Sequence, residues 1–197
     1  RETSKVIEFN DIGALETALS ARDVAAVLAE PAMTNIGIIH PNPGYHEALR
    51  EMTRKYGTYL IIDETHTICT GPGGYTASFG LQPDFLTLGK PLAGGVPAAI
   101  YGFTEEVSQA FNEKLSVEDS DVGGIGGTLA GNALSIAAMK ATLQNVLTDA
   151  YYSKAISLQE QFTEGVQSVI KEFNLPWIVK QLGNRSEYWF RPNPPKN

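Results

Sequence analysis

The stretch DFLTLGKPLAGGVPAAI, residues Asp84–Ile100, decides the fold that this sequence predicts. Its first half predicts a short, mostly buried strand, because apolar residues follow one another closely: Phe85, Leu86 and Leu88. Gly89 then removes steric bulk beside Lys90, and Pro91 prevents the strand from continuing. A lysine in this place is either a solvated residue at a strand end or an amine that points into a pocket.

Two apolar runs upstream have the same form, a short strand that ends in an acid. Val24–Ala29 ends at Glu30, and Tyr59–Ile62 ends at Asp63. The segment between them has apolar residues at helical spacing and a C-cap glycine, Gly57. A strand–helix–strand order of this kind predicts neighbouring parallel strands.

The rest of the chain completes an α/β pattern. We predict a fourth strand at Ala98–Phe103, a helix capped by Thr104 and a long helix after Thr128. An amphipathic helix follows at Asp149–Phe173, and two short strands follow it. The glycine-rich segment Thr67–Gly80 predicts a loop.

These elements predict a mainly parallel sheet with flanking helices, followed by the start of a small α+β carboxy-terminal domain. Residues 1–148 would form part of the large domain. Residues 149–197 would form a linking helix and the start of the small domain.

Composition narrows the function classes. Of the 197 residues, 43% are hydrophobic and 19% are charged, an ordinary globular composition. The net charge of −7 argues against nucleic-acid binding, which needs a basic face. The chain has no run long enough to span a membrane and no amino-terminal signal pattern, so we expect a cytoplasmic protein. The single cysteine, Cys69, fits that compartment, and its spacing from the three histidines does not suit zinc.

Three reactive side chains stand at the predicted strand ends, where ligands bind in folds of this class: Glu30, Asp63 and Lys90. The segment Gly123–Gly127 precedes a helix with Thr128 near its start, which predicts an anion site. An amine, an acid and an anion site match the aldehyde, ring nitrogen and phosphate of pyridoxal 5'-phosphate (PLP). Lys90 would form the Schiff base, and a carboxylate would keep the ring nitrogen protonated.

Four segments resemble, in the same order, segments of the class III aminotransferases, which have the fold-type I architecture of PLP-dependent transferases. Three are LIIDETHT (60–67), PDFLTLGKPLAGGVPAAIYG (83–102) and GGTLAGNALSIAAMKATL (126–143). The fourth, EPAMTNIGIIHPNPGYHEALREMTRKYG (30–57), is most similar to the glutamate-1-semialdehyde aminomutases. The resemblance extends from about Ile7 to the end of the chain.

The resemblance implies catalytic roles for two residues and a cofactor contact for a third. Lys90 would carry the Schiff base and move the proton between substrate and cofactor. Asp63 would pair with the ring nitrogen, since an ion pair favours the charged form of both partners. Thr65 would lie against one face of the ring. Without the other motifs, Asp63 could equally be a helix-capping or loop acid with no cofactor role.

Three further cofactor contacts follow from the resemblance. Asn35 and His66 would lie near the ring hydroxyl. Thr128 would bind the phosphate of the neighbouring subunit, which implies a homodimer with shared active sites. The structural alternatives are a turn asparagine, a packed loop histidine and an ordinary N-cap, respectively.

The implied reaction is amino-group transfer by an aminotransferase or aminomutase, with amino-acid or amino-aldehyde and keto-acid substrates. Departures from the family pattern leave the substrate open: Thr65 replaces valine or isoleucine, and Leu129, Ala130 and Ala133 replace an aromatic residue, a serine and a proline. Arg185 and Arg191 are candidates for the substrate carboxylate by charge alone.

Length leaves two alternatives to an active aminotransferase. Class III enzymes are roughly twice as long, in keeping with a large and a small domain. We therefore expect a fragment that lacks the amino-terminal part and the end of the carboxy-terminal domain. Such a chain could be a catalytically silent fragment without cofactor. It could also belong to a PLP enzyme of another reaction type, such as a racemase or decarboxylase.

Overall fold

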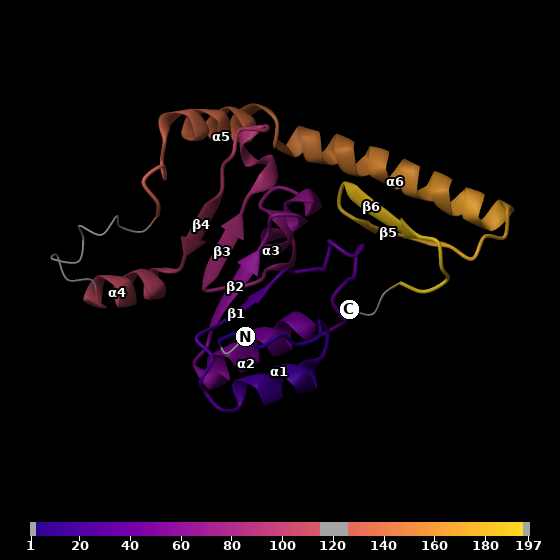
Figure 1. The fold of residues 1–197 in the computed structure, drawn as a ribbon. Helices are drawn as coiled ribbons and strands as arrows, with labels where there is room; N and C mark the ends of the chain where they lie inside the picture. The colour runs from indigo at the N-terminus through magenta and orange to yellow at the C-terminus, as the bar shows by residue number, and fades with distance from the viewer. Residues whose placement is uncertain (1–2, 115–125, 195–197) are drawn as a thin grey trace.

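A four-stranded sheet in the order β1-β2-β3-β4 forms the centre of the computed structural model, which describes residues 3–114 and 126–194 (Figure 1). The strands are β1 (Ala26–Ala29), β2 (Tyr59–Asp63), β3 (Phe85–Leu88) and β4 (Ile100–Phe103). The first three strands are parallel and β4 is antiparallel to β3. The prediction of an α/β fold with a mainly parallel sheet and flanking helices is confirmed.

Helices connect and flank these strands. They are α1 (Ile12–Leu19), α2 (Tyr45–Tyr56), α3 (Gly74–Phe79), α4 (Glu105–Lys114), α5 (Ala133–Asn145) and α6 (Asp149–Glu172), with 3₁₀ turns η1 (Thr67–Thr70) and η2 (Lys90–Ala93). Local signals set several boundaries. The Asp11 carboxylate accepts a hydrogen bond from the Ala14 N–H at 2.8 Å and begins α1. Gly57, at φ +69°, ends α2 as predicted. Within the described residues, no helix combines the length and apolarity needed to cross a membrane.

The main core lies between β2 and the helices α1 and α2, which run side by side on one face of the sheet (Figure 1). Its buried side chains come from all three elements: Leu15, Leu19, Tyr45, Leu49, Leu60 and Ile62. Burial of this apolar stripe fixes which residues of β2 face the helices.

The prediction of a loop at Thr67–Gly80 was wrong, because η1 and α3 lie there. The cause is Glu64, which is 1% exposed. Its carboxylate accepts hydrogen bonds from the Thr67 hydroxyl and from the backbone N–H groups of Tyr75 and Thr76. The bonds to Tyr75 and Thr76 satisfy free N–H groups at the start of α3. Glu64 itself stands about ten residues earlier in the chain. A cap that comes from so far along the chain is invisible to local sequence rules.

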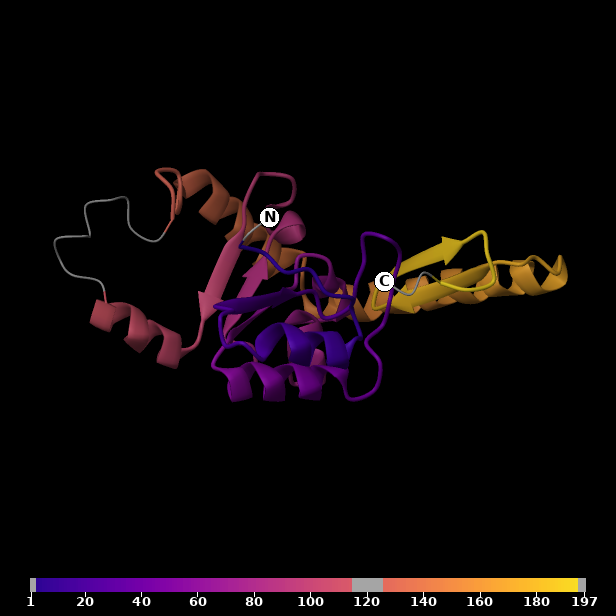
Figure 2. The same cartoon turned by 60° about the horizontal axis from the view of Figure 1, so that its bottom comes forward.

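A separate antiparallel pair of strands packs against α6, beside the central sheet and apart from α1 and α2 (Figures 1 and 2). The two strands are β5 (Ile178–Leu182) and β6 (Arg185–Trp189), and they match the predicted strand pair. Their turn docks on η1: the Asn184 N–H donates to the Cys69 carbonyl at 3.0 Å, and the Cys69 thiol donates to the Leu182 carbonyl at 3.3 Å. The hairpin therefore supports the segment that follows β2.

Substitution of Gly183 by alanine should loosen this docking. Gly183 has φ +55°, and a Cβ there would overlap the Cys69 carbonyl and lie 2.6 Å from Thr70 Cα. We expect Gly183→Ala to lower the free energy of unfolding by about 1–3 kcal/mol through overpacking and backbone strain. Gly165→Ala is the matched control, because a Cβ on this α6 residue meets nothing. It should raise stability by about 0.5–1 kcal/mol. Urea unfolding of both variants checks these opposite signs, and equal shifts would contradict the docking.

Candidate active site

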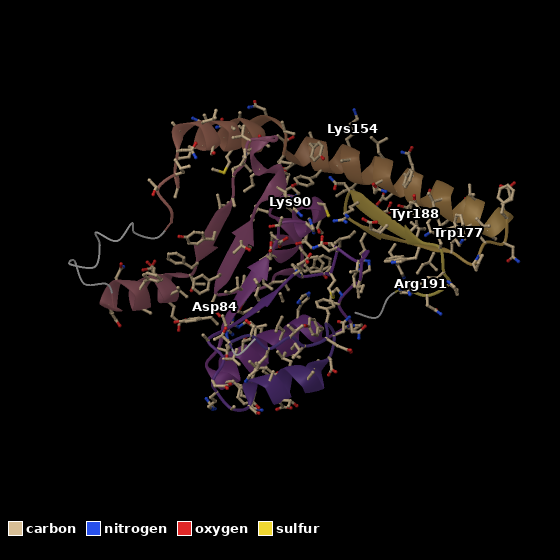
Figure 3. All side chains as sticks on the ribbon, viewed as in Figure 1. Asp84, Lys90, Lys154, Trp177, Tyr188 and Arg191 are labelled. Carbon is tan, nitrogen blue, oxygen red and sulfur yellow. The ribbon has the colours of Figure 1, made fainter. Side chains whose placement is uncertain are left out.

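Lys90 begins η2 two residues after the end of β3, and its backbone is strained. Its φ is +48°, in the left-handed region that non-glycine residues rarely adopt. Such a conformation costs on the order of 1–3 kcal/mol and is concentrated at functional sites. The Lys90 side chain is exposed and lies between the central sheet and the layer made by α6 and the hairpin (Figure 3).

Asp63 is brought next to this lysine by strand pairing. It is the last residue of β2, and its register partner on β3 is Thr87, three residues before Lys90. One carboxylate oxygen, Oδ1, accepts a hydrogen bond from the Thr65 N–H at 2.8 Å. A Cβ on Gly89 would lie 3.7 Å from the Thr65 hydroxyl, so Thr65 stands against the backbone that leads into Lys90.

A chain of hydrogen bonds leads from Lys90 to the end of β1. Lys90 Nζ bonds to Nε2 of His66, and His66 Nδ1 bonds to the hydroxyl of Thr34. That hydroxyl donates to the Glu30 carboxylate at 2.6 Å. Glu30 Oε2 is also 3.7 Å from His66 Nδ1. Two of the predicted strand-end residues, Lys90 and Glu30, are therefore joined through two loop side chains.

A cavity of about 260 Å³ opens beside Lys90. Its walls come from the segment after β2, from the start of α6 and from the hairpin turn, and they include Thr65, His66, Cys69, Leu147, Tyr151, Tyr152 and Asn184. Burial raises the pKa of the Tyr152 hydroxyl to about 12 and that of the Cys69 thiol to about 11. Both groups stay protonated at neutral pH, so neither adds a negative charge to the cavity.

A second, larger cavity of about 520 Å³ lies between α6 and the hairpin, around Trp177 and Tyr188 (Figure 3). Its walls are almost entirely apolar, and they share no residue with the cavity at Lys90. It offers no amine, carboxylate or histidine. Among the described residues, no group of three or more histidine, cysteine or acidic side chains is placed to hold a metal ion.

Two predicted cofactor contacts form no hydrogen bond to this cluster within the described residues. Asn35 is exposed, and its side chain makes no hydrogen bond within residues 3–114 and 126–194. Its neighbour Thr34 contacts His66 instead. Thr128 is exposed in a turn, and α5 begins later, where the Asn132 side chain accepts from the Ser135 N–H at 2.9 Å. Thr128 is therefore not the N-cap of α5. Of the predicted glycine-rich anion site, residues 123–125 lie outside the described residues.

The two candidate arginines have different surroundings. Arg185 forms an ion pair with Glu187 at 2.7 Å and donates to the Thr34 carbonyl at 3.1 Å. It links β6 to the loop that carries Thr34. Arg191 follows β6 and is exposed (Figure 3).

Sequence reasoning missed Thr34 and the cavity walls from α6 and the hairpin turn. The residues concerned are Tyr151, Tyr152 and Asn184. Thr34 had a weak signal, because it stands four residues after Glu30 in the same strand-end loop. The others had none, since about sixty residues or more separate them from Lys90 along the chain.

The sheet, with a strained lysine and an acid at the carboxyl ends of adjacent parallel strands, defines a fold-type I transferase architecture. The aminotransferase class-III family model matches residues 2–185. The chain belongs to the class III aminotransferase family.

Its relatives include glutamate-1-semialdehyde 2,1-aminomutases. The chain is 33% identical to glutamate-1-semialdehyde 2,1-aminomutase 2 of Brevibacillus brevis over 95% of its own length and 43% of that protein. It is 35% identical to the Sorangium cellulosum enzyme over 98% of its length and 43% of that protein. The chain thus spans less than half the length of these relatives.

Solved structures agree with this assignment. A glutamate-1-semialdehyde aminomutase of Pseudomonas aeruginosa PAO1 superposes with a TM-score of 0.91 at 46% identity, over 98% of this chain and 44% of that one. A lysine-to-alanine variant of such an enzyme from the same organism, in complex with PMP, gives 0.91 at 44% identity and the same coverage. An omega-transaminase from Sphaerobacter thermophilus gives 0.79 at 31% identity, over 94% and 42% of the two chains.

Proposed function

We propose that this chain carries the cofactor-binding centre of a PLP-dependent class III aminotransferase or aminomutase. The observation that carries the proposal is the register of β2 and β3, which puts Asp63 beside the strained backbone of Lys90. Family membership and the PMP complex of a relative point to the same cofactor. The relatives' names, an aminomutase of glutamate-1-semialdehyde and an omega-transaminase, favour an amino-aldehyde or amino-acid substrate. For the aminotransferase reaction we propose a keto acid as the amino acceptor.

The residues present fit PLP by the chemistry of their donor set. An exposed amine, Lys90, can bond covalently to the aldehyde carbon. Asp63 uses one carboxylate oxygen for the Thr65 N–H, which leaves the other for a protonated ring nitrogen. The cavity at Lys90 is bounded by Thr65 and His66. Lys90 and Asp63 come from two adjacent strand ends. They can therefore reach the aldehyde and the ring nitrogen of one flat ligand.

When bound, PLP supplies an aldehyde that captures amino groups and a ring that withdraws electrons from the substrate α-carbon. The chain's own residues provide the rest. Lys90 Nζ is the covalent attachment point and carries a proton to and from the substrate α-carbon. Asp63 keeps the proton on the ring nitrogen. Thr65 lies against the ring, and His66 and Asn35 serve its hydroxyl. Thr128, exposed at the start of the α5 region, serves the phosphate of a partner subunit in a homodimer.

The domain organisation that we propose follows the same assignment. Residues 1–148 belong to the large cofactor-binding domain, and residues 149–197 are the linking helix and the start of the small domain. The separate β5–β6 sheet on α6 supports this division. We also propose a cytoplasmic location, which the unpaired thiol of the single cysteine, Cys69, supports.

The first test is optical. PLP is added to the purified chain, the visible absorption is recorded, and an amino donor follows. We expect a new visible band that the donor bleaches, with no such band in Lys90→Ala. Lys154→Ala is the matched control, because this exposed lysine lies on α6 away from the site, and it should behave as wild type (Figure 3). A wild-type chain that gives no band would favour the catalytically silent alternative. Product analysis with amino and keto acids distinguishes an aminotransferase or aminomutase from a racemase or decarboxylase.

A further inference from the structure

The hydrogen-bond chain Lys90–His66–Thr34–Glu30 has a direction that can be worked out by counting hydrogens. The Glu30 carboxylate can only accept, so the single hydrogen of the Thr34 hydroxyl goes to it. The hydroxyl oxygen is then left to accept from His66, so Nδ1 must carry the hydrogen. In a neutral imidazole this leaves a lone pair on Nε2, the nitrogen that faces Lys90 Nζ.

Burial makes this assignment firm. Thr34 is 1% exposed, so water does not compete for its hydroxyl. Its backbone is held as well, because Arg185 donates to the Thr34 carbonyl at 3.1 Å. The hydroxyl thus sits between a fixed acceptor, Glu30, and one nitrogen of His66. A side chain so placed sets both the orientation and the tautomer of the imidazole ring.

We propose that Glu30 and Thr34 are positioning residues that fix the Nδ1–H tautomer of His66, and that His66 Nε2 takes a proton from the Lys90 ammonium. The proposal rests on the proposed function, since the unprotonated amine is the form that attacks an aldehyde. One Nζ–H bond breaks and its electron pair stays on Nζ. An Nε2–H bond forms, and the positive charge moves to the imidazolium. Glu30, 3.7 Å from Nδ1, stabilises that charge.

The surroundings of His66 favour its neutral form, which can accept a proton at Nε2. Its pKa is lowered, first by burial and then by the positive charges of Lys90 on η2 and Arg185 on β6; Glu30 after β1 and Asp63 on β2 act in the opposite direction. His66 is therefore neutral at pH 7. The proton transfer is transient, because an amine is more basic than an imidazole. Reaction of the unprotonated Lys90 amine with an aldehyde removes it and so favours further proton transfer. Below the lowered pKa, His66 holds both protons and cannot accept, so Lys90 should lose reactivity toward acidic pH.

The decisive experiment is ¹⁵N NMR of the histidine rings in the cofactor-free chain at neutral pH. His66→Gln identifies the His66 signals among the three histidines. We expect a protonated Nδ1 and an unprotonated Nε2 in the wild type. Thr34→Val, which removes the hydroxyl but keeps the shape, should abolish that preference, and Thr34→Ser should restore it. Thr53→Val is the matched control, because the hydroxyl of this buried threonine donates only to carbonyls of α2.

A second readout follows the amine itself. Acetylation of Lys90 by acetic anhydride, measured by peptide mass spectrometry across pH, should slow several-fold in Thr34→Val and recover in Thr34→Ser. A wild-type His66 with its proton on Nε2, or an acetylation profile unchanged by Thr34→Val, would overturn the proposal. Both readouts need no PLP. A missing PLP band together with the expected tautomer would count against the proposed function alone, and a normal band with the wrong tautomer would count against this inference alone.

Discussion

Replacement of Glu64 by alanine is expected to lower the free energy of unfolding by about 3–6 kcal/mol. The carboxylate is fully buried and accepts from the Thr67 hydroxyl and from the N–H groups of Tyr75 and Thr76. Its removal orphans three donors, two of them buried and one partly buried, and each costs about 1–3 kcal/mol. Gly74, whose Cβ would lie 2.6 Å from a Glu64 oxygen, shows how closely the chain is wrapped around this acid.

Urea unfolding measures this effect, with Glu160→Ala as the control. Glu160 is exposed in the middle of α6, and its loss should change stability by no more than about 0.5 kcal/mol. Glu64→Ala should also loosen η1 and α3, and with them the wall of the cavity at Lys90. A loss below about 1 kcal/mol would mean that Glu64 does not organise the segment after β2.

Asp63→Asn is expected to slow amine exchange on the PLP-loaded chain by about 10²–10³-fold, the usual effect of removing one electrostatic partner from a reacting centre. The amide keeps the oxygen that accepts from the Thr65 N–H, so the local turn is preserved. It lacks the negative charge that would hold a proton on the ring nitrogen. The chain should therefore still bind PLP through Lys90 and exchange amino groups poorly.

Stopped-flow absorbance with an amino donor measures that rate. Asp11→Asn is the matched control, because it makes the same chemical change at the N-cap of α1, where asparagine caps as well as aspartate. It should exchange amino groups at the wild-type rate. An Asp63→Asn chain that also reacts at the wild-type rate would remove Asp63 from the proposed site.

The strands and most helices could be predicted because their signals are local. Short apolar runs marked β1 to β3, and a C-cap glycine, Gly57, marked the end of α2. The failures have non-local causes. The cap of α3 comes from Glu64, and α5 begins at Ala133 because Asn132, not Thr128, caps it. The orientation of β4, antiparallel to β3, also depends on how the chain returns to the sheet.

The candidate site was predictable in so far as it depends on strand ends. Parallel strands bring their carboxyl ends to one edge, so Glu30, Asp63 and Lys90 could be grouped from the sequence alone. The connection between them could not, because it runs through Thr34 and His66, two loop side chains whose contacts depend on tertiary packing. The left-handed backbone of Lys90 was equally hidden, since no sequence rule gives a lysine positive φ.

Every role proposed for this site depends on Lys90 as the residue that binds PLP covalently. The most direct measurement is borohydride reduction of the chain with PLP, followed by proteolysis and mass spectrometry of every lysine-containing peptide. Near-stoichiometric reduced cofactor should be found on the Lys90 peptide, and Lys90→Arg, which keeps the charge, should leave only trace labelling. Reduced cofactor spread over exposed lysines such as Lys154, or unchanged labelling in Lys90→Arg, would contradict this role of Lys90.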